Sequence, residues 1–275
     1  MKITNKIYNI NGNINTKLVL ISDIHYYNKS NIKVLNKILD LLRKINPNYI
    51  CIPGDIIDNS NILDEKYLIE WLRKLANISK VIISIGNHEY YIDKKNNKFG
   101  ANIKLMNKIK KIENVYYLDN KSIVIDNINF VGVTMPIEYY MTEGEKIESF
   151  NNNFNFNLYK KNKYNILLLH SPSNLLDKTV INKLKYDLIL CGHTHGGIVP
   201  KVIRPILRNR GLINPQGNIL SKNCYGFINK KPNILVTSGI TTLSYENPFS
   251  IFNKLFSPEV VTINIEDWLI NSFLV

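Results

Sequence analysis

Five runs of β-prone residues in this chain each end in a polar segment, and these segments hold all five histidines. The segments are Asp23-Ile-His25, Gly54-Asp55-Ile-Ile-Asp58, Gly86-Asn87-His88-Glu89, His170 and Gly192-His193-Thr-His195-Gly-Gly. Ligands of open α/β sheets bind at the carboxyl ends of the strands, so this order predicts that the polar groups meet at one edge. Apolar strands gain nothing from ending in unpaired imidazoles and carboxylates, which favours a functional site over packing.

The segments between these motifs alternate between strand and helix patterns. Residues 17–22, 49–53 and 81–85 are β-rich, whereas 31–45, 65–76 and 101–112 carry apolar residues at helical spacing. This alternation indicates βαβ units and a largely parallel sheet. Further strand candidates are 115–118, 122–126, 128–134, 166–170, 187–191, 234–238 and 260–265. The pattern therefore predicts an α/β fold with two packed sheets flanked by helices.

Composition points to a globular protein. With 275 residues and 45% hydrophobic residues, we expect a single domain over 1–275. Three cysteines, Cys51, Cys191 and Cys224, form no disulfide framework and fit a reducing compartment. Residues 1–16 lack the apolar core of a signal peptide, and no apolar run is long enough to span a bilayer. The expected location is the cytoplasm.

The chain is strongly basic, with a net charge of +13. One interpretation is a nucleic-acid or anionic-membrane partner. The other is compositional drift, because Asn, Lys and Ile are abundant together and the lysines are scattered rather than gathered into one stripe. We favour drift, although a positive field would still attract a phosphate substrate.

The residue types in the polar segments suit divalent transition metals. Imidazole and carboxylate ligands favour manganese, iron or zinc, and no all-oxygen calcium cage is present. Seven candidate ligands are too many for one ion of roughly four to six ligands, but they suit two ions that share a carboxylate. Asp55 is the natural candidate for that bridge.

The series Asp-x-His, Gly-Asp-x-x-Asp, Gly-Asn-His-Glu, His and Gly-His-x-His resembles the calcineurin-like metallophosphoesterase family. All five blocks are present in family order from Asp23 to His195. Segments 192–197, 225–227, 234–239 and 257–260 are similar to the bacterial YkuE/YaeI-like branch of that family. The resemblance implies an α-β-β-α sandwich and a metal-dependent phosphoric ester hydrolase.

The resemblance also implies a role for each motif residue. Asp23, His25 and His195 would bind the first metal ion, and Asn87, His170 and His193 the second, with Asp55 between them. A hydroxide shared by the two ions, with manganese the favoured metal, would attack phosphorus.

Three further residues of the motifs are assigned to catalysis. His88 would protonate the leaving oxygen or steady charge on the phosphoryl group, and Glu89 would orient its ring. Asp58 would fix a ligand imidazole. The alternative for Glu89 and Asp58 is an ordinary carboxylate at a helix start.

The chain departs from the branch pattern at three places. Ile198 stands where the branch often has Gln, Ser238 where it often has Arg, and Thr134-Met135 where it has an acidic pair. These differences leave the metal-binding motifs intact but put the substrate preference of the branch in doubt.

Two segments are candidates to face the substrate. Residues 138–163 are aromatic and polar and could form a lid over the metals. Residues 201–213 mix Arg and Lys with aliphatic residues, which suits a rim for a lipid-like or nucleotide substrate or a peripheral membrane contact. The favoured alternative for 201–213 is an ordinary loop with buried aliphatic and solvated arginine side chains, since Pro205 interrupts any amphipathic helix.

The predicted function is a phosphodiesterase that acts on a phosphorylated small molecule or a lipid phosphate. A non-catalytic metal-binding scaffold of the same fold is an alternative, but such a scaffold should have lost ligands or His88, and this chain keeps them. A nuclease is the other alternative, prompted by the charge alone, and nucleic acid is not the favoured partner because no distinct binding motif is visible.

Overall fold

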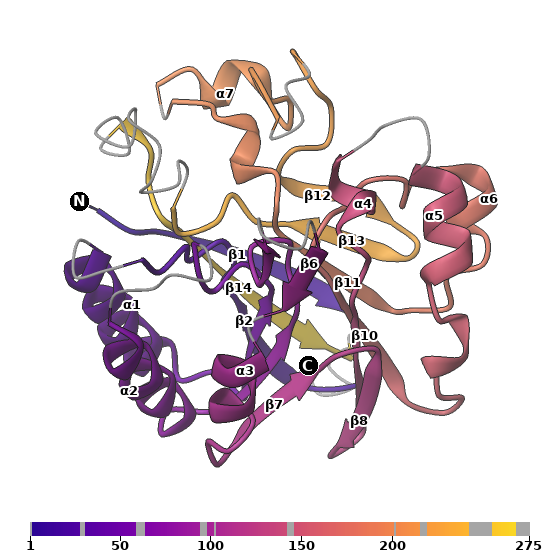
Figure 1. Cartoon of the computed structure of the whole chain (residues 1–275). Coiled ribbons are helices and arrows are strands. Elements are labelled where there is room, and N and C mark those ends of the chain that lie inside the picture. The colour runs from indigo at the N-terminus through magenta and orange to yellow at the C-terminus, as the bar shows by residue number, and fades with distance from the viewer. Residues whose placement is uncertain are drawn as a thin grey trace, which may run out of the picture.

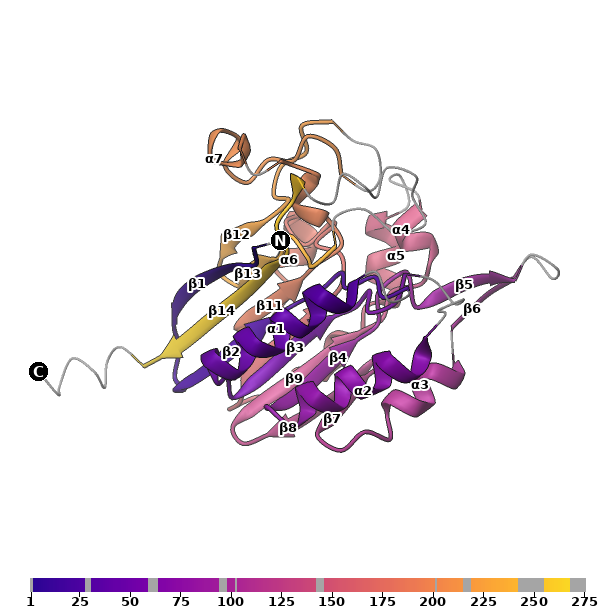
Figure 2. The same ribbon diagram turned by 90° about the vertical axis from the view of Figure 1, so that its left-hand side faces the viewer.

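Two six-stranded sheets pack face to face in the computed structural model, with helices on their outer sides (Figures 1 and 2). The structure describes residues 2–27, 31–58, 64–93, 98–101, 103–141, 146–200, 202–214, 219–241 and 255–267. The first sheet has the order β1 (Thr4–Asn11), β14 (Glu259–Glu266), β2 (Thr16–Leu20), β3 (Tyr49–Pro53), β4 (Lys80–Ser84), β7 (Val115–Leu118). The second has the order β12 (Gly226–Lys230), β13 (Asn233–Val236), β11 (Leu188–Cys191), β10 (Tyr164–Leu169), β9 (Ile128–Val133), β8 (Lys121–Ile125).

Both sheets are mixed. Strands β2, β3, β4 and β7 run parallel in the first sheet, and β9, β10, β11 and β13 run parallel in the second. Antiparallel pairs join β14 to β2, β8 to β9 and β12 to β13. A separate hairpin consists of β5 (Tyr90–Asp93) and β6 (Lys98–Ala101). The predicted α/β architecture of two packed mixed sheets is confirmed.

Helices cover the two outer faces. The first sheet carries α1 (Ile32–Ile45), α2 (Glu65–Ala76) and α3 (Ile103–Ile109), and the second carries α4 (Glu138–Met141), α5 (Lys146–Asn153) and α6 (Lys178–Ile181) (Figure 2). The described residues also include the short turns η2 (Phe156–Leu158) and η3 (His195–Gly197) and helix α7 (Arg204–Leu207). Among the described residues, no helix is both long enough and apolar enough to cross a lipid bilayer.

Local sequence explains the longest helices. Helix α1 buries Leu35, Ile38, Leu39 and Leu42, whose spacing forms one apolar stripe. Helix α2 starts at an N-cap, because a carboxylate oxygen of Asp64 accepts a hydrogen bond from the Tyr67 backbone N–H at 3.1 Å.

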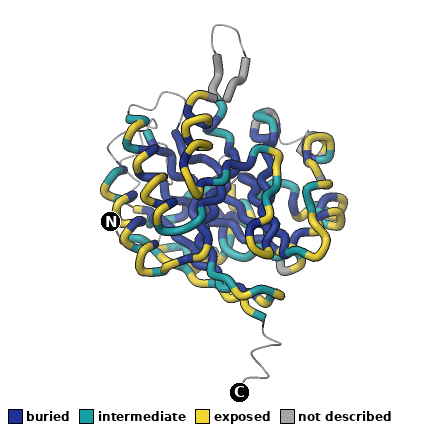
Figure 3. The backbone as a smooth tube through the Cα atoms, turned by 90° about the horizontal axis from the view of Figure 1, so that it is seen from below, coloured by how far each residue is buried: buried dark blue, intermediate teal, exposed yellow. Residues whose placement is uncertain are grey.

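The apolar interior forms three clusters, one at each interface between layers. One lies between the first sheet and its helices, one between the two sheets, and one between the second sheet and its helices. The central strands are therefore buried on both faces, as the dark central tube in Figure 3 shows. Burial on both faces explains why these strands read as continuous apolar runs rather than as alternating patterns.

Some elements differ from the sequence prediction. Strand β1 has a polar sequence and was not predicted as a strand. The side-chain oxygens of Asn5 and Asn9 accept hydrogen bonds at 2.9 Å from Thr262 and Asn264 on β14, so β1 depends on its partner strand. The helix predicted at 101–112 covers only Ile103–Ile109.

Three aromatic residues of the segment 138–163, which is predicted to form a lid over the metals, pack into the core, whereas the Tyr140 ring also lies beside His170 and His193. Tyr139, Phe150 and Phe154 pack into the cluster beneath the second sheet, because that apolar face needs a cover. Residues 142–145 of this segment and Lys201 of the basic loop lie outside the described residues.

Candidate metal centre

The five polar segments meet at one edge of the sandwich, at the carboxyl ends of strands from both sheets. Asp23 and His25 follow β2, Asp55 follows β3, Asn87 and His88 follow β4, His170 follows β10, and His193 and His195 follow β11. Three groups of side chains each bring their ligand atoms within 4.8 Å of one another. They are Asp23 with His25 and His195, His25 with Asp55 and His88, and Asp55 with His170 and His193.

The turns that carry these residues have an uncommon backbone conformation. Asp23, His25, Asp55, His193 and His195 all have positive φ values, between 46° and 69°. Such values are disfavoured for residues other than glycine and persist only where the surroundings impose them. Hydrogen bonds between the turns do this, since the Asp55 carbonyl accepts from His25 N–H at 3.1 Å and the Asp23 carboxylate accepts from His193 N–H at 2.9 Å.

Two glycines of the motifs allow the turns to approach closely. A Cβ atom on Gly192 would lie 2.5 Å from an oxygen of Asp23, and one on Gly86 would lie 2.2 Å from an oxygen of Asp55. Both distances are shorter than any real contact, so a side chain at either position would displace a carboxylate.

Five buried side-chain atoms of the expected metal ligands have no hydrogen-bond partner. They are Asp23 Oδ2, His25 Nε2, Asp55 Oδ2, Asn87 Oδ1 and His170 Nε2, and each belongs to a residue that the sequence nominated as a metal ligand. Unsatisfied buried polar atoms are costly, and a cation among these oxygen and nitrogen atoms would offset that cost. The donor set thus fits divalent transition metals.

The histidine rings are oriented with one nitrogen toward this cluster. Nδ1 of His170 donates to the Pro53 carbonyl at 2.7 Å, and Nδ1 of His195 donates to the Thr241 carbonyl at 2.8 Å. Since a carbonyl can only accept, Nδ1 carries the proton and the neutral ring presents an unprotonated Nε2. His25 is held the same way by Asp58, whose carboxylate accepts from Nδ1 at 3.1 Å.

Electrostatics divide the histidines into two kinds. Burial lowers the pKa of His193 well below its ordinary value and also lowers that of His195, so both rings are neutral and able to coordinate a metal. Burial opposes protonation of His170 too, but the neighbouring Asp55 carboxylate outweighs it and raises the pKa of His170 to about 9. The atoms His170 Nε2 and Asp55 Oδ2 lie 3.0 Å apart without the alignment of a hydrogen bond.

The three residues nominated for catalysis lie in this cluster, but one has different contacts from those predicted. His88 is the most exposed of the five histidines, and its Nδ1 donates to the Asp58 carbonyl. The Glu89 carboxylate does not orient His88 but accepts from backbone N–H groups of Asp55, Ile56 and Gly86 at 2.6–3.0 Å. Burial and the Asp55 charge raise the pKa of Glu89 to about 7.

Tyr140 is an aromatic neighbour of the centre that sequence reasoning did not single out. Its ring centroid lies 5.3 Å from that of His193 and 5.9 Å from that of His170, and its buried hydroxyl has no hydrogen-bond partner. The only signal in the sequence was the aromatic character of 138–163.

A buried ion-pair network around Glu259 was also missed. The Glu259 carboxylate accepts from the Ser238 backbone N–H at 3.0 Å and lies 2.8 Å from Lys6 Nζ and 3.6 Å from Arg204. Gly239, which follows Ser238, packs against Asp23: a Cβ atom on Gly239 would lie 2.7 Å from the Asp23 Cβ. Glu259 therefore supports the turn on which Asp23 rests, and its only signal was the segment 257–260.

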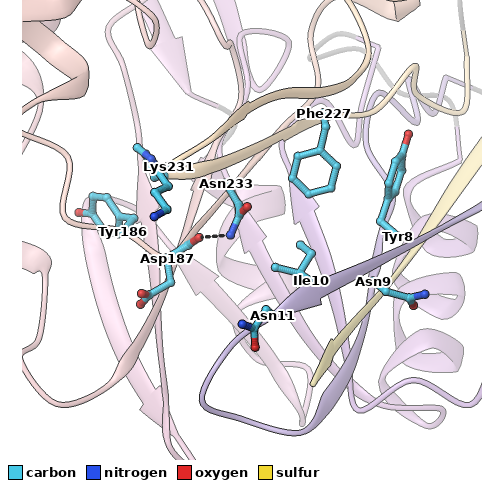
Figure 4. Close-up of a pocket in the computed structure, with 10 residues that line it drawn as sticks. Tyr8, Asn9, Ile10, Asn11, Tyr186, Asp187, Phe227, Lys231 and Asn233 are labelled. Carbon is cyan, nitrogen blue, oxygen red and sulfur yellow. Dashed lines mark hydrogen bonds between the residues drawn. The ribbon is translucent and has the colours of Figure 1, made fainter. Parts of the chain in front are cut away.

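A polar cavity of about 400 Å³ adjoins the centre. His193 and Thr194 form one wall, and the segments 172–177 and 221–224 form much of the rest. A larger cavity, about 710 Å³, lies elsewhere, between β1 and the starts of β11 and β13 (Figure 4). In this cavity Asn233 donates a hydrogen bond to the Asp187 carbonyl at 3.0 Å. No histidine lines the cavity, so cavity size alone does not locate the metal centre.

Comparison with known proteins places these motifs in a family. The family model of the calcineurin-like phosphoesterases matches residues 16–197. An uncharacterised metallophosphoesterase of Campylobacter jejuni is 28% identical over 185 residues, which are 66% of this chain and 44% of that protein. One from Helicobacter pylori is 26% identical over 183 residues, 66% of this chain and 45% of that protein, so the chain spans less than half the length of these relatives.

Among solved structures, the Pseudomonas putida nuclease MPE aligns with a TM-score of 0.32 and 16% identity, over 65% of this chain and 61% of that one, which is too weak a likeness to inform function. The family model is different, because it matches more than half of the chain and includes every motif from Asp23 to His195. The chain belongs to the calcineurin-like phosphoesterase family.

Proposed function

We propose that this chain binds two divalent metal ions and hydrolyses a phosphate ester, with a phosphodiester as the preferred substrate. The observation that carries this proposal is the set of five buried ligand atoms without hydrogen-bond partners, all on family motif residues. A structural role alone would leave their desolvation cost without compensation.

Each ion would have its own ligand set. Asp23, His25 and His195 would hold the first ion, in keeping with their mutual distances within 4.8 Å, and Asn87, His170 and His193 would hold the second. Asp55 would bridge them, because it groups both with His25 and with His170. The carboxylates of Asp23 and Asp55 are the two negative charges in this ligand set, and they do not neutralise two divalent cations. The loaded site would therefore keep a positive charge that attracts phosphate.

The ions, when bound, would supply a water of lowered pKa and a positive charge beside the phosphoryl oxygens. The chain's own residues would do the rest. Protonated His88 would donate from Nε2 to the leaving oxygen while its Nδ1–H stays on the Asp58 carbonyl. The water, having released one proton to solvent, would join phosphorus through its oxygen as the bond to the leaving oxygen breaks. The leaving oxygen would take the proton from His88, and His88 would regain one from solvent.

The remaining parts of the proposal concern the metal and the substrate. Manganese is the favoured ion, since sites of mixed imidazole and carboxylate accept several metals and manganese suits their oxygen ligands. The substrate would be a phosphorylated small molecule or a lipid phosphate. The polar cavity beside His193 lies where the alcohol part of an ester could bind.

The test combines metal analysis with an activity assay. Protein stripped with a chelator and reloaded with manganese should hold about two ions per chain and hydrolyse bis-p-nitrophenyl phosphate, whereas the stripped protein should not. Two bound ions with no turnover across diesters, monoesters and pyrophosphates would indicate a metal-binding scaffold instead. Little tightly bound metal would refute the ligand assignment itself.

A further inference from the structure

We propose that a protrusion beside the metal centre, formed by residues 202–214 and 219–222, docks on an anionic lipid bilayer. The protrusion follows the His-Gly-Gly turn and carries α7, which stands clear of the sandwich in two perpendicular views (Figures 1 and 2). The proposal concerns membrane binding and does not depend on the proposed phosphoesterase activity.

The outer surface of the protrusion is unusually apolar. Nine large apolar side chains are exposed among the described residues, and five of them lie here. These are Val202 (86% exposed), Ile206 (80%), Ile219 (75%), Leu220 (52%) and Ile213 (45%). Single exposed aliphatic residues are ordinary, but such a concentration in one short segment marks an interaction surface.

The inner side of the protrusion is held in place by polar contacts. The Gly197 carbonyl accepts from the Leu212 N–H at 2.8 Å, and the Arg204 guanidinium stacks 4.8 Å from the Tyr225 ring centroid and pairs with Glu259. Arg204 therefore turns inward while Val202 and Ile206 turn to solvent. Arg204, Val202 and Ile206 thus depart from the favoured expectation of buried aliphatic and solvated arginine side chains for 201–213, whereas Arg208 and Arg210 are exposed as expected.

The charges on the protrusion suit an anionic surface. Arg208, Arg210 and Lys222 are exposed and flank the apolar side chains, and the whole chain carries a net charge of +13. Apolar residues flanked by basic residues form the combination that inserts at the interface of an anionic bilayer, where burial and electrostatic attraction add. A second copy of this chain would instead bring like charges together.

The position of the protrusion links membrane contact to the metal centre. Asn214, Ser221 and Lys222 line the polar cavity that His193 also lines. Docking would therefore bring the lipid headgroup region close to that cavity.

The test is flotation of the full chain with vesicles. Wild-type protein should bind vesicles of equal parts phosphatidylglycerol and phosphatidylcholine and should stay unbound with phosphatidylcholine alone. The double variant Val202→Ser/Ile206→Ser should bind the anionic vesicles at least roughly tenfold more weakly, since it loses two inserting side chains. Ile7→Ser, at a 61% exposed site on β1, is the matched control and should bind like wild type.

Charge is tested separately with two variants of equal net charge. Arg208→Gln/Arg210→Gln should weaken binding to anionic vesicles more than Arg43→Gln/Arg73→Gln, whose arginines lie on α1 and α2. Equal losses would mean that net charge alone attracts the protein, which would overturn the proposal. Binding of Val202→Ser/Ile206→Ser that equals wild-type binding would also overturn the proposal. A third contrary result would be a wild-type dimer that this double variant converts to a monomer, since a second copy would then cover the surface.

Discussion

The turns that carry the proposed metal ligands and the protrusion of residues 202–214 and 219–222 depart in opposite ways from the usual placement of side chains. In a folded protein polar side chains usually lie outside and apolar side chains inside. The turns bury carboxylates, imidazoles and the Asn87 amide, and five of these side-chain atoms lack hydrogen-bond partners. The protrusion exposes aliphatic side chains such as Val202 and Ile206. Buried polar groups and exposed apolar groups are the informative exceptions in a folded protein, because both are costly unless something binds them.

The difference between the two regions indicates different kinds of ligand. Rigid, strained turns with fixed imidazole tautomers suit a small ion that needs defined geometry. An apolar surface on a projecting segment suits a large and chemically uniform partner such as a bilayer. Substitutions in the first region should therefore change chemistry, and substitutions in the second should change location with little effect on chemistry.

The largest expected effect is that of Asp55→Asn. Replacing the proposed bridging carboxylate should reduce bound metal to at most about one ion per chain and lower kcat/KM for bis-p-nitrophenyl phosphate by roughly a thousandfold or more. Asp40→Asn, an exposed position on α1, is the control. Retention of two ions by Asp55→Asn in elemental analysis would count against the bridging role.

His88→Ala should separate catalysis from metal binding. The proposed loss of proton donation should lower kcat by about a hundredfold or more, while both ions remain bound. The measurement is steady-state kinetics together with metal analysis. Loss of one ion instead would identify His88 as a ligand, a role that its grouping with His25 and Asp55 would explain.

Metal affinity should rise with pH. In the metal-free protein the pKa of His170 is about 9, because the charge of Asp55 outweighs burial, so near neutral pH a metal ion must displace its proton. Apparent affinity should therefore strengthen by up to about tenfold per pH unit between pH 6 and 8, as measured by competition with a chelator. A flat profile would mean that His170 is already deprotonated, or is no ligand.

Glu259→Gln should act on the metal centre from a distance. The Lys6 and Arg204 cations would lose their shared carboxylate, which should lower stability by about 2 kcal/mol and weaken metal binding to Asp23 by up to about tenfold. Chemical denaturation and metal titration measure the two effects. Glu70→Gln, an exposed position on α2, is the control, and equal behaviour of both variants would argue against a supporting role.

The smallest effect is expected for Ile206→Ala on the protrusion. Because this side chain is 80% exposed, unfolding free energy should change by no more than about 0.5 kcal/mol. Leu168→Ala, in the cluster between the sheets, should cost about 2–5 kcal/mol. A large loss for Ile206→Ala in urea denaturation would mean that the protrusion packs against the protein in solution.

Local patterns predicted much of the fold because strand and helix periods are local properties. Strand 49–53 and helix 65–76 were predicted with the bounds that the structure gives, since each carries its pattern within a few residues. Strand β1 was missed, because its polar residues are paired with side chains of β14 that lie more than 250 positions away in the sequence. The roles of Arg204 and Glu259 were missed for the same reason.

The sequence alone determined which side chains reach the metal-centre edge, because a residue that follows a parallel strand must emerge at the end of that strand. It also determined family membership, through motifs in a fixed order. Only the tertiary structure decided which imidazole nitrogen a backbone carbonyl holds, what Glu89 contacts, and which side of the protrusion faces solvent. These features depend on contacts between segments remote in sequence, and local composition does not encode such contacts.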